Sequence, residues 1–175
     1  MTNVAVARAG YSDLPRGAES VHVLIALVED RPGAVDRVVG VLRRKRANTQ
    51  SLSMGRSETP DVVRITALVK DLDVSVDNLA EQVRKVADVR QVVNLTAQQA
   101  VIRELVLVKV STTTDNVHEV IATADQFGGV VVAITLDTVI FEVSGDEEKI
   151  TKCMDALRTY DIREIARSGH IATGR

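Results

Sequence analysis

The sequence carries the same order of hydrophobic patterns twice, and this repetition constrains its fold more than any other feature. In each half, short runs rich in valine and isoleucine alternate with stretches in which apolar residues recur every three or four positions. The first pattern is typical of β-strands, and the second places apolar side chains on one face of a helix. A chain of 175 residues is long enough for two small domains, so we expect two related domains in tandem.

The order of elements in the first half is strand, helix, strand, strand, helix, strand. Pro32 and Gly33 separate the first strand from the first amphipathic helix. Strands are expected at residues 21–28, 49–54, 62–69 and 89–95, and helices at residues 35–42 and 76–86. This βαββαβ order is that of a ferredoxin-like α+β domain, in which an antiparallel sheet carries both helices on one face.

The second half repeats this order over residues 104–168. Strands are expected at residues 104–111, 130–136, 138–145 and 162–168, and helices at 117–124 and 150–157. Gly128 and Gly129 follow the first of these helices and are typical of a helix C-terminus. The predicted organisation is a flexible N-terminal arm (1–20), a first domain (21–95), a connector (96–103) and a second ferredoxin-like domain (104–175). The stretch AQQAVIRE is compatible with a helix, so the connector is either rigid or a loose linker.

The strands at residues 21–28 and 105–110 are apolar at both odd and even positions. Helices cover only one face of such a sheet, so the second face also needs burial. Another domain or another copy of the chain is the simplest cover. We therefore predict an oligomer in which sheets or sheet edges meet.

The residue types that usually carry catalysis or hold metals do not converge in this sequence. His22, His118 and His170 are far apart, and none has a histidine or cysteine nearby at metal-ligand spacing. Cys153 lies next to the apolar face of the last predicted helix, where a buried small side chain is the simpler interpretation. We predict no catalytic residue and no metal site.

Composition argues against several classes of partner. The net charge is -2 with both signs mixed along the chain, and the sequence has two phenylalanines, two tyrosines and no tryptophan. This leaves no overall attraction to phosphate and few platforms for stacking bases, so we expect no nucleic-acid partner. No apolar run approaches the roughly 20 residues that cross a bilayer, and a single cysteine cannot form an internal disulfide. We expect a cytoplasmic protein without membrane contact.

The turn EDRPGAV, residues 29–35, is the strongest candidate for a binding site. It places the backbone N–H groups of a helix N-terminus directly after a strand, where they are suited to receive a carboxylate. Gly33 allows a ligand to approach closely, and Asn48 offers a side-chain amide that both donates and accepts hydrogen bonds. In the alternative interpretation, Pro32 and Gly33 only start the helix and Asn48 only forms a turn. The spacing alone leaves both interpretations open.

The stretch VEDRPGAVDRVVGVLRRKRANTQSLSMG resembles the ACT-type amino-acid-binding segment of acetolactate synthase small subunits. Two later stretches, IRELVLVKV and EIARSGHIATGR, resemble the opening of the second domain and the closing strand and tail of that family. The resemblance runs from about Val21 to the C-terminus. The family commonly has a glycine and an aromatic residue before the asparagine and isoleucine after it, whereas this chain has Arg46, Ala47 and Thr49. These departures leave the preferred amino acid open.

The resemblance implies a regulatory subunit of acetolactate synthase in branched-chain amino-acid biosynthesis, with an ACT domain as its first domain. Two ACT domains would pair into a homodimer, and valine or a related branched-chain amino acid would bind between them. The chain would activate a large catalytic subunit, which joins two pyruvates with loss of carbon dioxide, and would confer feedback inhibition. Thiamine diphosphate, magnesium and FAD are expected on the catalytic subunit, and no cofactor on this chain. The implied effector-binding residues are Asp30, Gly33, Ala34 and Val35 of one protomer with Asn48 and Thr49 of the other.

Two other functions are open at this point. The chain could be a free-standing ACT-type sensor that controls another protein, which a search for its partner would test. It could also catalyse a reaction alone, which the lack of convergent titratable groups disfavours.

Overall fold

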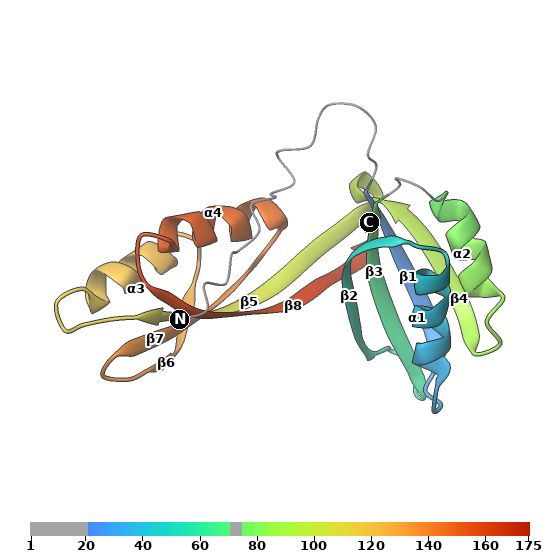
Figure 1. The fold of residues 1–175 in the computed structure, drawn as a ribbon, viewed down its shortest axis with the longest axis horizontal. Coiled ribbons are helices and arrows are strands. Elements are labelled where there is room, and N and C mark those ends of the chain that lie inside the picture. Colours follow the sequence, from blue (N-terminus) through green and yellow to red (C-terminus); the bar gives the residue numbers. More distant parts are fainter. Residues whose placement is uncertain (1–20, 71–74) are drawn as a thin grey trace.

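The computed structural model describes residues 21–70 and 75–175, and it contains two α+β domains joined by a pair of long strands (Figure 1). Each domain is a four-stranded antiparallel sheet with two helices against one face, as the repeated pattern predicted. The arm predicted at residues 1–20 lies outside the described residues. The first domain consists of β1 (Val21–Glu29), α1 (Ala34–Arg44), β2 (Asn48–Arg56), β3 (Val62–Lys70), α2 (Val76–Arg84) and β4 (Val89–Thr96). After the short 3-10 helix η2 (Ala97–Gln99), the second domain consists of β5 (Ala100–Ser111), α3 (Val117–Asp125), β6 (Val130–Ile134), β7 (Thr138–Gly145), α4 (Glu147–Leu157) and β8 (Ile162–Gly174).

In the first domain the strands lie in the order β2-β3-β1-β4, so β2 and β4 are the edge strands. The helices α1 and α2 cover one face of this sheet with the aliphatic residues that their periodicity predicted. Val38, Leu42, Leu79 and Val83 are each at most 6% exposed and pack in one core with the central strands. The helical spacing therefore marks the residues that hold α1 and α2 on the sheet.

In the second domain the strands lie in the order β6-β7-β5-β8. Phe141 of β7 is fully buried in its core, between the sheet and the helices α3 and α4. Gly128 has a φ of 64°, and the backbone N–H groups of Gly128 and Gly129 donate to the carbonyls of Asp125 and Ala124. This geometry confirms that the two glycines end α3.

The strands β5 and β8 are longer than the sequence patterns predicted. The strand β5 begins at Ala100, inside the stretch predicted as a connector, and only Ala97–Gln99 of that stretch is helical. The strand β8 continues past residue 168 to Gly174. The two strands pair with each other along their length and form a ribbon that reaches from the second domain to the open face of the first sheet (Figure 1).

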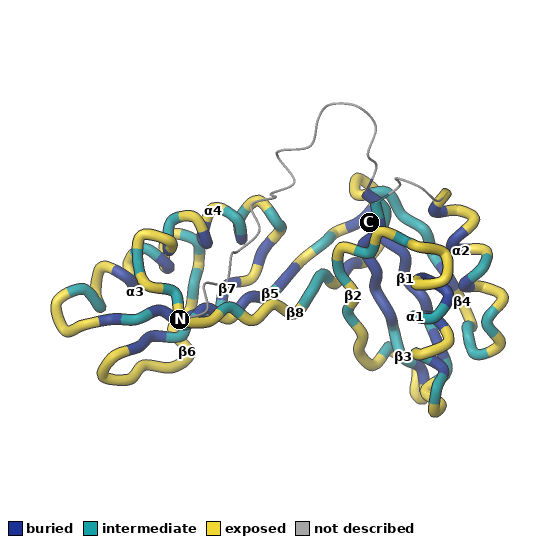
Figure 2. The backbone as a smooth tube through the Cα atoms, viewed as in Figure 1, coloured by how far each residue is buried: buried dark blue, intermediate teal, exposed yellow. Residues whose placement is uncertain are grey.

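This ribbon covers the second apolar face of β1. Val21 and Val23 are at most 9% exposed and pack against Ala100 of β5 and Ala172 of β8, which lie at the same end of the ribbon. The second face of the first sheet is therefore covered by strands of the second domain of the same chain. Buried residues are concentrated along the central strands of both sheets (Figure 2). In the second domain, Leu107 of β5 is 37% exposed, and the predicted oligomer stays a prediction.

His170 lies in β8 where the ribbon meets the first sheet. Both of its ring nitrogens are buried without a hydrogen-bond partner among the described residues. Burial lowers the pKa of His170, and the nearby Arg167 adds to this effect. The buried carboxylate of Glu104, which pairs with Arg167 at 2.7 Å, opposes it by raising the pKa of the imidazole. The neutral form of His170 is therefore favoured in the folded protein.

Acidification is expected to destabilise the protein through His170. A histidine whose pKa is lowered on folding binds fewer protons in the folded state than in the unfolded state. Its contribution to the free energy of unfolding is complete above about pH 6.5 and is lost as the pH falls through the folded pKa. Urea unfolding of the wild type and of His170→Gln at about pH 7.5 and about pH 5.5 checks this. The wild type should lose more stability over this interval, and equal losses would contradict the prediction.

Candidate functional site

The turn between β1 and α1 has the backbone geometry of an open anion site. Gly33 adopts a left-handed conformation with φ 78° and ψ −3°, which other residues adopt only with strain. Within the turn, the N–H of Ala34 donates to the carbonyl of Arg31 at 3.1 Å, and the N–H of Arg37 donates to the carbonyl of Gly33 at 3.1 Å. No described side chain caps the start of α1. The positive end of the helix dipole is therefore free to attract a carboxylate.

Arg37, near the start of α1, reaches this turn with its side chain, and the sequence patterns did not single it out. Its Nη1 atom lies 3.1 Å from the place that a Cβ atom on Gly33 would occupy. Its Nε and Nη2 atoms both contact Oδ2 of Asp88 at 2.7 Å, which fixes the guanidinium over the turn. Arg37 adds positive charge beside Gly33, and its position four residues later, one helical turn away, is the signal that could have identified it.

The other residues predicted in this turn have different surroundings. Asp30 is exposed, and its backbone N–H donates to the carbonyl of Asp61 at 2.9 Å. Ala34 is fully buried with its side chain in the core of the first domain, so it can meet a ligand only through its backbone. Val35 is half-buried and packs against the same core. Asp30 and Val35 thus offer side chains at the surface of the turn.

Asn48 and Thr49 lie at the other end of the sheet. Asn48 begins β2 opposite Lys70, which in turn pairs with Val21 at the start of β1. The turn that holds Gly33 follows the end of β1, and a strand of nine residues spans about 30 Å. Within one chain, the structure therefore does not bring Asn48 and Thr49 together with the turn.

Both residues make only local contacts in the described structure. The exposed Asn48 accepts a hydrogen bond on Oδ1 from Nε2 of Gln50 at 2.6 Å. The Thr49 hydroxyl donates to the carbonyl of Ala47 at 3.4 Å. The Asn48 amide nitrogen has no partner in residues 21–70 and 75–175, so the side chain has hydrogen-bonding capacity left for a ligand.

The position of β2 suggests how two copies of the chain could complete the set. It is an edge strand, and its last residue, Arg56, lies opposite Val63 at the same end of the sheet as the Gly33 turn. If two copies of β2 paired antiparallel about a two-fold axis, the start of one would face the end of the other. Asn48 of one copy would then lie near the Gly33 turn of its partner.

Metal binding, thiol chemistry and membrane spanning have little support in the part of the chain that the structure describes. No group of three or more histidine, cysteine, aspartate or glutamate side chains in residues 21–70 and 75–175 is arranged to hold a metal ion. Cys153 is buried in the second core, and this burial raises the pKa of its thiol, with a smaller opposing effect from Lys149. None of the described helices is long and apolar enough to span a membrane.

Comparison with known proteins decides the family. The family "Small subunit of acetolactate synthase" matches residues 103–175, and the family "AHAS small subunit-like ACT domain" matches residues 24–91. A probable acetolactate synthase small subunit of Methanothermobacter thermautotrophicus is 36% identical over 155 residues, which cover 88% of this chain and 92% of that protein. The chain belongs to the acetolactate synthase small-subunit family.

Two further small subunits agree with this assignment over both domains. The acetolactate synthase small subunit of Mycolicibacterium smegmatis is 33% identical over 154 residues, which cover 88% of this chain and 91% of that one. The crystal structure of the acetolactate synthase small subunit from Thermotoga maritima matches with a TM-score of 0.82 and 27% identity, over 89% of this chain and 97% of that one. The predicted family and the tandem ferredoxin-like fold are confirmed, and the first domain is an ACT domain. Membership in a small-subunit family implies a catalytic-subunit partner.

Proposed function

We propose that this chain activates the catalytic subunit of acetolactate synthase and makes it sensitive to feedback inhibition by valine or a related branched-chain amino acid. The family membership supports the regulatory role, since a small subunit of this enzyme has a separate catalytic partner. The joining of two pyruvates to 2-acetolactate, with loss of carbon dioxide, takes place on that partner. The thiamine diphosphate, magnesium and FAD that we expect for the enzyme also belong there.

The effector binds between two ACT domains that pair through β2. The observation that carries this proposal is the placement of the candidate residues at opposite ends of one sheet, which a two-fold axis at the β2 edge, perpendicular to the strand, would bring together. In this site the start of α1 at Gly33 receives the carboxylate, and Arg37 adds positive charge. Asp30 meets the ammonium group, and Asn48 of the other protomer bridges across the interface.

The remaining site residues complete this arrangement. Ala34 contributes its backbone at the start of α1, Val35 offers an apolar surface for the aliphatic side chain, and Thr49 stands beside Asn48. A ligand in such a site inhibits only if it binds one arrangement of the assembly more tightly than another. Binding across the interface meets this requirement, because the ligand contacts both protomers only when the ACT domains are paired.

The decisive experiment measures acetolactate formation by the cognate catalytic subunit, with and without this chain, across a valine titration. The chain should raise the rate, and valine should lower the rate only when the chain is present. Valine binding to the chain without any effect on the catalytic subunit would instead favour the free-standing sensor. If the rate changes neither with the chain nor with valine, the regulatory proposal is wrong.

A further inference from the structure

Two hydrogen bonds join one residue of β8, His170, to the edge strand β2 of the ACT sheet. The hydroxyl of Ser53 donates to the carbonyl of His170 at 2.6 Å, and the N–H of His170 donates to the hydroxyl of Ser51 at 2.8 Å. Both serines belong to β2 and are half-buried. We call these three residues, Ser51, Ser53 and His170, the β2–β8 clasp. It occupies both backbone hydrogen-bonding groups of His170.

A bulge in β8 shapes the chain for this clasp. Ser168 and Gly169 together stand opposite the single residue Leu105, whose N–H donates to the Ser168 hydroxyl at 3.1 Å. Gly169 has a φ of 74°, and a Cβ atom on it would lie 3.0 Å from Oγ of Ser51. A glycine is therefore needed both for the backbone turn and for the close approach of β2.

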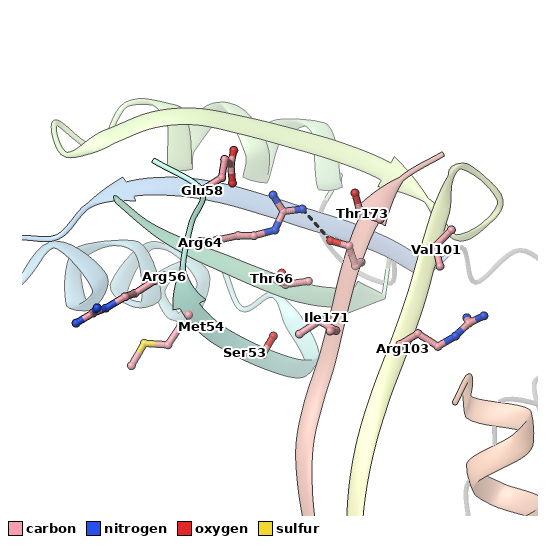
Figure 3. A pocket seen from close by; sticks show the side chains of 12 residues that line it. Ser53, Met54, Arg56, Glu58, Arg64, Thr66, Val101, Arg103, Ile171 and Thr173 are labelled. Atoms are coloured by element: carbon pink, nitrogen blue, oxygen red, sulfur yellow. Dashed lines mark hydrogen bonds between the residues drawn. The ribbon is translucent and has the colours of Figure 1, made fainter. Parts of the chain in front are cut away.

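The clasp lies on a narrow contact between the two domains. Ser53 lines a cavity of about 500 Å³, and His170 lines another of about 730 Å³. Figure 3 shows the first cavity, where Ser53, Thr66 and Arg64 of the ACT sheet face the end of β8, and Arg64 donates to the carbonyl of Ala172 at 2.8 Å. Because open space flanks the contact, a few hydrogen bonds and the small apolar cluster around Val23 hold the orientation of the domains.

The clasp is continuous with the effector site of the proposed function. Ser51 follows Asn48 by three residues in the same strand, and the ladder between β2 and β3 has an irregularity between Thr49 and Ser51. A ligand that fixes the start of β2 at a paired edge therefore acts on the segment that holds His170. A bulged strand can shift locally without loss of the whole ladder.

We propose that the β2–β8 clasp transmits the state of the ACT-domain interface to the second domain. This inference rests on the proposed function, because it names the route by which the effector site acts. When the amino acid fixes β2, the clasp holds the ribbon of β5 and β8 in one orientation, and the second domain takes a fixed position relative to the ACT pair. Without the clasp, the amino acid still binds between the ACT domains, but its binding no longer fixes the position of the second domain.

The double variant Ser51→Ala/Ser53→Ala tests this in the full chain with the cognate catalytic subunit. Calorimetry should give a Kd for valine within about twofold of the wild type, and activation should also stay within about twofold, because neither serine contacts the proposed ligand or the core. The valine concentration for half-inhibition should rise about tenfold or more, which is the range of typical coupling between sites. Ser57→Ala is the matched control, because the Ser57 hydroxyl bonds only within its own loop, where it donates to the Thr59 carbonyl and accepts from the Thr59 N–H. The complex with this variant should be inhibited like the wild type.

Hydrogen exchange provides a second, independent test of the same proposal. Valine should slow exchange of the amides of residues 168–174 in the wild type but not in the double variant. An inhibition curve of the double variant that superimposes on the wild type would overturn the proposal. If the double variant does not fold, Ser53→Ala alone should raise the half-inhibiting concentration about threefold, and a wild-type curve for it would overturn the proposal equally. Failure of the wild type itself to bind valine would refute the proposed function instead.

Discussion

Replacing Asn48 with histidine is expected to raise the valine concentration for half-inhibition by roughly five- to 150-fold while activation stays intact. Asn48 is exposed at the start of an edge strand, so the variant should fold normally. In the proposed site its amide both donates and accepts across the interface, and an imidazole cannot keep both bonds in the same geometry. A ligand group left without a partner costs about 1–3 kcal/mol, which corresponds to roughly five- to 150-fold in affinity.

The measurement is acetolactate formation by the complex of both subunits across a valine titration, with the Kd for valine determined separately. Because inhibition depends on how much of the site is occupied, the valine concentration for half-inhibition and the Kd for valine should rise by the same factor. Gln91→His is the matched control, because it places the same side chain on β4, the opposite edge of the same sheet, where Gln91 is exposed. An unchanged inhibition curve for Asn48→His would remove Asn48 from the site.

Replacing Phe141 with alanine is expected to lower the free energy of unfolding of the second domain by about 3–5 kcal/mol. Phe141 is fully buried among aliphatic residues from both helices and the central strand β5. Its truncation removes a large apolar surface and leaves a cavity that the surrounding sheet and helices cannot fill. The ACT domain has a separate core, so the loss should be confined to the second domain.

Urea unfolding followed by tyrosine fluorescence measures this loss, because Tyr160 packs against the core that contains Phe141. The transition should move to a clearly lower urea concentration with little change in slope. Leu136→Ala is the control, because Leu136 is fully exposed at the turn between β6 and β7 and its truncation should change stability by less than about 0.5 kcal/mol. A shift for Phe141→Ala as small as that of the control would show that this core does not hold the domain together.

The two largest expected effects belong to different parts of the chain. Asn48 lies on an exposed edge, and its replacement should change regulation without changing stability. Phe141 lies in a core, and the main effect of its replacement should be a loss of stability. The β2–β8 clasp lies between them, since its hydrogen bonds join an edge strand of one domain to the last strand of the other.

The sequence by itself determined the order of elements and the residues that form each core. The periods that predict strands and helices depend on which side chains face the same way, and this follows from backbone geometry alone. Gly128 and Gly129 likewise predict a helix end without any tertiary information, because a residue in the left-handed conformation commonly ends a helix in any surroundings. The family resemblance of residues 28–55 also depended only on the order of residues.

Only the tertiary structure decided where those residues lie relative to one another. The ends of β5 and β8 were predicted as connector and tail, because local patterns do not show that a strand continues through a bulge at Gly169 and packs on another sheet. Strands β1 and β2 both pair antiparallel with β3 and so run in the same direction, which places Asn48 at the opposite end of the sheet from Gly33 although the two are close in sequence. Strand order and domain contact depend on pairings between distant segments, and their energy comes from surfaces that no single stretch of sequence contains.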